Sequence, residues 1–131
     1  MTSAIKKILI VEDEPDTAEM FAEMMRMSGY EIYKAYNGSS AVALVRKEKP
    51  AAVVLDLMMP DLSGLEVLRL VRNDVNIADT PVIVVSAKSL PSDIKDGLEA
   101  GASVYLTKPV GYLDLKAAVE NAIRSSGKAS G

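Results

Sequence analysis

The segment Ala51-Ala52-Val53-Val54-Leu55-Asp56 places a carboxylate directly after a short, continuous apolar run. Runs this short and this apolar are typical of strands that are buried on both faces of a parallel sheet. A second run, Ile8-Leu9-Ile10-Val11, is followed in the same way by Glu12-Asp13-Glu14. Ligands of open α/β sheets bind at the carboxyl ends of the strands. The two runs therefore predict an acidic site at that edge of a sheet.

Apolar runs of this kind alternate along the chain with segments of helical spacing. The runs lie near residues 5–11, 30–36, 51–55, 81–85 and 104–106, and the helical segments cover 15–27, 39–49, 65–72, 92–100 and 113–123. The alternation predicts an α/β fold with a single (βα)5 doubly wound parallel sheet. Right-handed crossovers favour the flavodoxin-like strand order 2-1-3-4-5. We expect one domain over residues 1–124, followed by a small, polar, disordered tail over 125–131.

Composition excludes several classes of function. The 15 basic and 18 acidic residues give a net charge of −3, so no basic patch indicates direct binding to nucleic acid. The absence of cysteine and histidine excludes disulfides and the usual zinc ligands, and any metal must be bound by oxygen. No apolar stretch approaches the roughly 20 residues of a membrane span, and the N-terminus lacks the apolar core of a signal peptide. A cytoplasmic protein without a membrane partner is expected.

The strand ends predict a site for phosphoryl chemistry. If strands 1 and 3 are neighbours, Glu12, Asp13 and Asp56 come together, and their mutual repulsion favours a bound cation. Of the divalent cations, Mg²⁺ fits best a site formed by a few carboxylates and phosphate oxygens, and Mn²⁺ is a possible substitute. Asp56 is the candidate nucleophile. Lys108 can supply a mobile positive charge after the last strand, and Ser86 can supply a hydroxyl after the fourth.

Each signal is weak by itself. A strand-end aspartate is more often a helix N-cap than a nucleophile, a Lys-Pro pair is usually a turn, and a serine after a strand usually caps the next helix. The acidic run after the first strand can reflect the preference for acidic residues near a helix N-terminus. All four signals at successive strand ends are hard to obtain by chance.

Together these motifs resemble the receiver domain of two-component response regulators, over about residues 5–124. The motifs are Val11-Glu12-Asp13-Glu14, Val54-Leu55-Asp56-Leu57-Met58-Met59-Pro60, Asp61-Leu62-Ser63-Gly64, Val85-Ser86-Ala87 and Tyr105-Leu106-Thr107-Lys108-Pro109. The predicted strand order is also that of chemotaxis receivers, so it is not independent of this resemblance.

The resemblance implies roles for individual residues. Asp56 matches the phosphoacceptor, Asp13 and the backbone carbonyl of Met58 match the direct Mg²⁺ ligands, and Glu12 matches an acid that acts through water. Ser86 and Lys108 match the groups that move onto the phosphoryl group, and Tyr105 matches the aromatic switch that rotates inward. The peptide before Pro109 is expected to be cis.

The resemblance also implies a signalling role. The phosphoryl donor is expected to be a histidine kinase or a histidine phosphotransfer protein, and the output surface is the fourth helix, fifth strand and fifth helix, which would bind a downstream protein not identified by the sequence. The chain would assist its own phosphorylation and dephosphorylation without being an enzyme for another substrate.

The first helix carries a possible docking surface. At about 100° per residue, Met20, Met24 and Met27 fall roughly opposite the face that should pack on the sheet, which contains Ala18, Phe21, Ala22 and Met25. Methionine is common at adaptable binding surfaces. We interpret the stripe, with Pro109 and Val110, as a docking patch for the phosphoryl donor; the alternative is a partly shielded helix surface.

One departure from the family concerns the dimer. Ser103-Val104 stand where many DNA-binding response regulators carry an acidic pair used in dimer salt bridges. We therefore expect a monomer or a phosphorylation-dependent dimer of another kind. Because no effector segment follows Ile123, a stand-alone receiver or a piece of a longer protein is expected.

Three other functions share part of this pattern. A haloacid-dehalogenase-type phosphatase needs a second aspartate two residues after the nucleophile, where this chain has Met58. An FMN carrier needs a phosphate loop after the first strand, where Glu12-Asp13-Glu14 would repel phosphate. A receiver-fold adaptor that works without phosphorylation stays open.

Overall fold

The computed structural model describes residues 5–129, and its centre is a parallel sheet of five strands. The strands are β1 (Lys7–Val11), β2 (Glu31–Ala35), β3 (Ala52–Leu55), β4 (Val82–Ser86) and β5 (Val104–Thr107). Their order is β2-β1-β3-β4-β5, and every neighbouring pair is parallel. The predicted fold class and strand order are confirmed.

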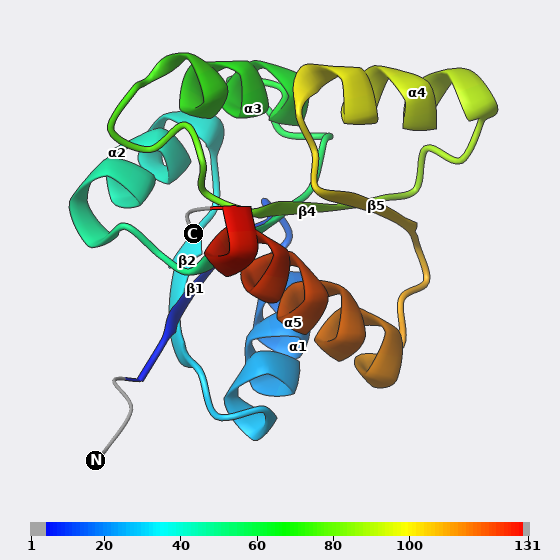
Figure 1. Cartoon of the computed structure of the whole chain (residues 1–131). Helices are drawn as coiled ribbons and strands as arrows, with labels where there is room; N and C mark the ends of the chain where they lie inside the picture. The colour runs from blue at the N-terminus through cyan, green and yellow to red at the C-terminus, as the bar shows by residue number, and fades with distance from the viewer. Residues whose placement is uncertain (1–4, 130–131) are drawn as a thin grey trace.

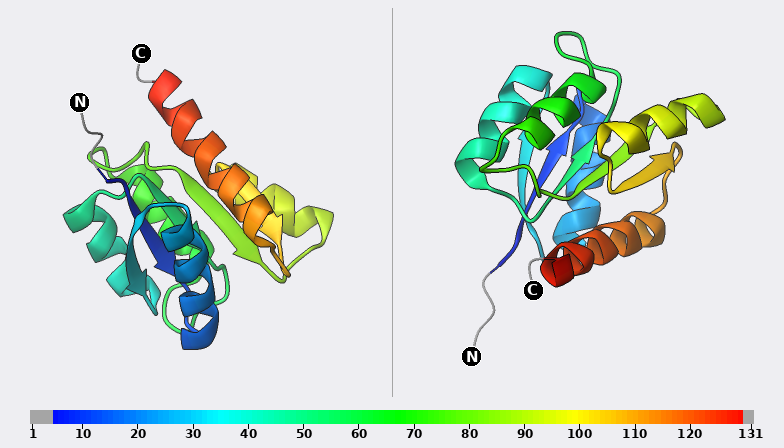
Figure 2. Two further views of the ribbon diagram at one scale, coloured as in Figure 1. Left: turned by 90° about the horizontal axis from the view of Figure 1, so that it is seen from below. Right: turned by 45° about the horizontal axis from the view of Figure 1, so that its top comes forward.

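Helices cover both faces of the sheet. They are α1 (Pro15–Met27), α2 (Gly38–Glu48), α3 (Gly64–Asn73), α4 (Pro91–Ala100) and α5 (Tyr112–Ala129). Helices α2, α3 and α4 lie on one side of the sheet, and α1 and α5 lie on the other (Figure 1). The view from below shows α1 and α5 in front of the strands (Figure 2).

The pleat of the strands divides the core into two layers. Along β1, Leu9 and Val11 point to the layer under α2 and α3, whereas Ile8 and Ile10 point to the layer under α1 and α5. All four residues of β3 are buried. A strand covered on both faces must be apolar throughout, which explains why β1 and β3 read as continuous apolar runs.

Strand register brings the ends of β1 and β3 to the same level. Val11 is paired with Leu55, and the Asp56 amide donates to the Val11 carbonyl at 3.0 Å. At the other side of β3, Ser86 of β4 is paired with Thr107 of β5. Residues that follow the strands are therefore collected at one edge of the sheet.

The end of α5 corrects the sequence prediction. The tail was expected to be disordered from residue 125, but α5 continues to Ala129, and residues 130–131 lie outside the described part. The helix is anchored by buried Leu115, Val119 and Ala122. Extending an anchored helix costs little because each added residue gains a backbone hydrogen bond, and no proline interrupts residues 124–129. Within residues 5–129, no helix has both the length and the apolar character needed to span a bilayer.

Candidate functional site

Three carboxylates meet at the carboxyl edge of the sheet. Glu12, Asp13 and Asp56 each offer one oxygen, and these oxygens lie within 4.8 Å of one another. Glu12 and Asp56 are buried, with 2% and 7% of their surfaces exposed, whereas Asp13 is exposed. The structure therefore brings together the acidic residues that the sequence placed at one site.

Backbone bonds hold these carboxylates in place. The Glu12 amide donates to the Ala35 carbonyl at 3.0 Å, which continues the pairing of β1 with β2. One oxygen of Glu12 accepts the Glu14 amide at 3.2 Å. Glu14 itself is the N-cap of α1 and accepts the Asp16 amide at 3.3 Å. The acidic run thus divides: Glu12 and Asp13 face the site, and Glu14 serves the helix N-terminus.

Lys108 completes the site from the end of β5. Its Nζ donates to Glu12 Oε1 at 2.8 Å and to Asp56 Oδ2 at 3.2 Å. Burial raises the pKa of Glu12, and the hydrogen bond from Lys108 opposes this rise. Burial would lower the pKa of Lys108, but its bond to Glu12 and the charge of Asp56 raise it. The lysine is therefore cationic and offsets part of the negative charge of the cluster.

The loop after β3 covers one side of Asp56. The Met58 amide donates to Asp56 Oδ1 at 3.1 Å, and Met58 is 55% exposed. One carboxylate oxygen of Asp56 thus faces a backbone N–H and the other faces an ammonium group. The peptide between Lys108 and Pro109 is cis, as expected.

Ser86 and Tyr105 both hold the backbone of Lys88. The hydroxyl of fully buried Ser86 accepts the Lys88 amide at 3.1 Å, and the Tyr105 hydroxyl donates to the Lys88 carbonyl at 2.8 Å. Both residues for which the sequence predicted a switch role therefore bind the loop between β4 and α4. Sequence reasoning missed this use of Lys88, because any residue supplies the same backbone groups.

Gly97 was also missed. It is buried within α4, and a Cβ at this position would lie 2.7 Å from Cδ2 of Tyr105. The Tyr105 ring thus occupies the space that a side chain would need. A glycine inside a helix was the available signal, because glycine is unfavourable there unless packing requires it.

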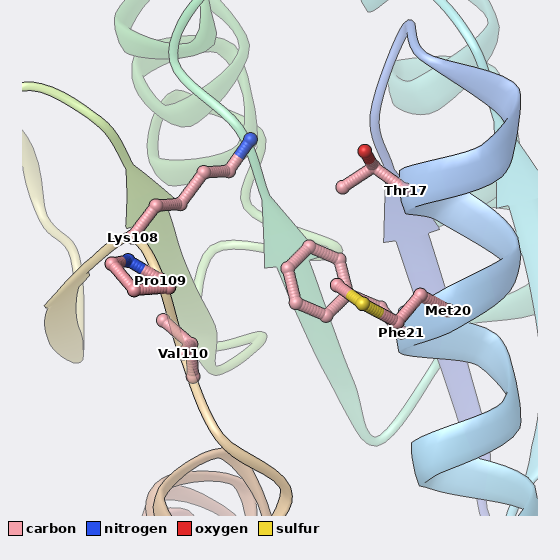
Figure 3. A pocket seen from close by; sticks show the side chains of 6 residues that line it. All are labelled: Thr17, Met20, Phe21, Lys108, Pro109 and Val110. Atoms are coloured by element: carbon pink, nitrogen blue, oxygen red, sulfur yellow. The ribbon is translucent and has the colours of Figure 1, made fainter.

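A groove of about 420 Å³ runs from the site along α1. It is lined by Thr17, Met20, Phe21, Lys108, Pro109 and Val110. Figure 3 shows Lys108, Pro109 and Val110 on one side and the α1 residues on the other. Met20 is 47% exposed, and the predicted docking residues Met20, Pro109 and Val110 all line this groove together with Lys108.

The methionine stripe is only partly as predicted. Met27 is 70% exposed, but Met24 is half-buried and packs against the core layer under α1 and α5. Placing Met24 opposite the core face was wrong. Helix α1 lies beside α5, where the Ser28 and Tyr112 hydroxyls are 3.2 Å apart, so residues at the edge of its core face are also covered.

Known proteins are similar to this chain in sequence and in fold. The response regulator receiver domain family matches residues 8–120. The probable transcriptional regulatory protein TcrX of Mycobacterium tuberculosis is 39% identical over 120 residues, which cover 92% of this chain and 50% of that protein. The phosphate regulon transcriptional regulatory protein PhoB of Pseudomonas aeruginosa is 38% identical over 122 residues, which cover 93% of this chain and 53% of that protein. The chain thus spans about half the length of these curated relatives.

A solved structure is similar over the whole fold. It is the receiver domain of the sensor histidine kinase PA1611 of Pseudomonas aeruginosa, with a magnesium ion coordinated in its active-site cleft. The TM-score is 0.85 at 30% identity, with 92% of this chain and 99% of that chain covered.

Proposed function

The chain belongs to the response regulator receiver domain family, and we propose that it serves phosphorelay signalling by accepting a phosphoryl group on Asp56. The observation that carries this proposal is the meeting of Asp56 with two further acids and Lys108 at one edge of the sheet. A buried carboxylate flanked by a cation and a backbone N–H has the surroundings that a phosphoryl acceptor needs.

The residues present suit Mg²⁺. The cluster offers only hard oxygen donors, which Mg²⁺ and Mn²⁺ prefer. We propose Asp13, Asp56 and the Met58 backbone carbonyl as direct ligands, with Glu12 acting through water. The bound ion would offset the repulsion among the carboxylates and the charge of the arriving phosphoryl group. The magnesium ion in the PA1611 receiver supports this assignment.

In the proposed transfer, a carboxylate oxygen of Asp56 attacks the phosphorus of a phosphohistidine. The new O–P bond forms as the N–P bond breaks, and the departing imidazole keeps the electron pair and takes up a proton. The Met58 amide and Lys108 hold the two carboxylate oxygens in the resting site. After transfer, Lys108 would exchange its bond to Asp56 for one to a phosphoryl oxygen, because that group carries more negative charge.

The backbone of Lys88 would transmit the signal. Ser86 is the acceptor in its bond to the Lys88 amide, so its hydroxyl proton can be donated to a phosphoryl oxygen. A movement of Ser86 toward the phosphoryl group would displace the backbone of Lys88. The Tyr105 hydroxyl would then move as well, because it donates a hydrogen bond to the Lys88 carbonyl. Since Lys88 precedes α4, the surface formed by α4, β5 and α5 would respond.

We propose that the groove beside α1 receives the phosphoryl donor, a histidine kinase or a phosphotransfer protein. Met20, Pro109 and Val110 supply apolar contact next to Lys108, and exposed Met27 extends this surface along the helix. Half-buried Met24 would contribute only its exposed part. The receiver would pass the signal to a downstream protein as a monomer or as a phosphorylation-dependent dimer, without contacting nucleic acid itself.

Intact-mass spectrometry after incubation with acetyl phosphate and Mg²⁺ tests the function. We expect one added phosphoryl group that is absent with EDTA and absent in Asp56→Asn. Absence of an adduct, in protein shown by NMR to bind Mg²⁺, would favour an adaptor that works without phosphorylation. An adduct that persists in Asp56→Asn would place the chemistry on another residue.

A further inference from the structure

Asp61, in the loop between β3 and α3, binds the beginning of a different helix. Its Oδ1 accepts the Gly38 amide at 2.8 Å, and its Oδ2 accepts the amide and the hydroxyl of Ser39 at 3.0 and 2.8 Å. The next amide of α2, that of Ser40, is bound by the Asn37 side chain at 2.9 Å. The first N–H groups of α2 thus depend on two side chains, one of them from a distant loop.

The loop is pressed against α2 as well as bonded to it. A Cβ at Gly38 would lie 2.5 Å from Leu62 Cβ and 3.0 Å from the Leu62 carbonyl oxygen. Helix α2 is itself fixed to the core through buried Ala41, Val42 and Val45. The tip of the loop therefore rests on a rigid element.

The base of the loop is closed just as tightly. The Gly64 amide donates to the Leu57 carbonyl at 2.8 Å, and a Cβ at Gly64 would lie 2.5 Å from the Asp56 carbonyl oxygen. Between this closed base and the Asp61 contact lies Met58, whose amide binds Asp56. Few loop conformations satisfy both ends at once.

We propose that Asp61 is a positioning residue, which anchors the loop to α2 and thereby holds the Met58 backbone at the phosphoacceptor site. This inference rests on the proposed function, because Met58 matters only if Asp56 and its metal are used. Without the anchor, the loop would have to be ordered each time the metal binds, and that ordering opposes binding. The bonds from Gly38 and its neighbours hold the pKa of Asp61 well below its usual range, so the anchor is ionised at neutral pH.

The decisive variant is Asp61→Asn, which keeps the shape of the side chain but places an NH₂ group among N–H donors. The matched control is Asp74→Asn at the end of α3. Like Asp61, Asp74 accepts hydrogen bonds from a backbone amide, that of Asn76, and from a side chain, Arg46 Nε at 2.9 Å. Loss of a group that orients metal ligands typically weakens metal binding by roughly tenfold or more. We expect about this loss of Mg²⁺ affinity by calorimetry for Asp61→Asn and no such loss for Asp74→Asn.

A second readout needs no metal. In EDTA, the amides of residues 57–63 should exchange with solvent faster in Asp61→Asn than in the wild type, whereas Asp74→Asn should leave them unchanged. If Asp61→Asn does not fold, Ser39→Ala removes only one of the three bonds, and we expect roughly threefold weaker Mg²⁺ binding in the folded variant.

The outcomes separate the inference from the function. Unchanged Mg²⁺ affinity and unchanged exchange in folded Asp61→Asn, with a wild type that is phosphorylated, would overturn the role of Asp61 and leave the function intact. A wild type that neither binds Mg²⁺ nor accepts a phosphoryl group would overturn both.

Discussion

Replacement of Gly97 by alanine is expected to destabilise the protein, although alanine is the better helix former. The added Cβ would lie 2.7 Å from Cδ2 and 2.8 Å from Cε2 of Tyr105. Carbon atoms in contact prefer a separation of about 3.5–4.0 Å, so the ring would have to retreat by roughly 1 Å. Because the Tyr105 hydroxyl donates to the Lys88 carbonyl at 2.8 Å, that retreat would stretch the bond until it is lost.

The opposing effects can be estimated. Alanine in place of glycine stabilises a helix by about 1 kcal/mol. Overpacking destabilises by about 1–3 kcal/mol, and the lost hydrogen bond contributes about 1 kcal/mol more. The free energy of unfolding should therefore fall by about 1–3 kcal/mol.

Urea unfolding of four proteins, followed by far-ultraviolet circular dichroism, measures this effect: the wild type, Gly97→Ala, Tyr105→Ala and the double variant. In the Tyr105→Ala background the ring is gone, so Gly97→Ala should become stabilising by about 1 kcal/mol. The sign of the substitution thus reverses with the ring. Equal stabilisation by Gly97→Ala in both backgrounds would refute the steric argument.

The remaining predictions concern Lys108 and the groove. Lys108→Met removes the cation that opposes the rise of the Glu12 pKa, so this pKa should rise further. A carboxyl group whose pKa is raised by folding destabilises the fold at pH values above that pKa, where it is charged. This destabilisation disappears as the pH falls and the group is protonated. In EDTA, the urea midpoint of Lys108→Met should therefore lie furthest below that of the wild type at about pH 8 and should approach it at about pH 5. A difference between the two midpoints that does not change with pH would contradict this explanation. Met20→Lys should slow phosphoryl transfer from a phosphotransfer protein but not from acetyl phosphate. The control is Val75→Lys, which should change neither rate, because Val75 is 88% exposed and lies between α3 and β4. Equal slowing with both donors would exclude a docking role for Met20.

Local pattern predicted most of the elements and the core. The apolar runs located the strands because strands covered on both faces must exclude polar side chains. Helical spacing identified the core face of α1, where Ala18, Phe21, Ala22 and Met25 are buried. The same spacing misplaced Met24, because periodicity gives an angle around the helix axis but not how far neighbouring elements extend around it.

Ser103 makes a tertiary contact that the sequence did not predict. Its hydroxyl accepts the Val82 amide at 3.1 Å, and its own amide donates to the Val82 carbonyl at 2.8 Å. The serine thus joins the start of β5 to β4. The residue types before Tyr105 gave no indication of this role.

The sequence was sufficient to place Asp56, Glu12 and Lys108 at one edge of the sheet. The apolar runs located the strand ends, and the strand order, which the family resemblance also implied, brought those ends together. The structure alone reveals that Asp61 binds the start of α2 and that Tyr105 binds Lys88. These contacts join residues 23 and 17 positions apart, and their backbone acceptors and donors carry no residue-specific signal. They form only when packing brings the loops together, so the positions of the loops around the site were decided by the tertiary structure.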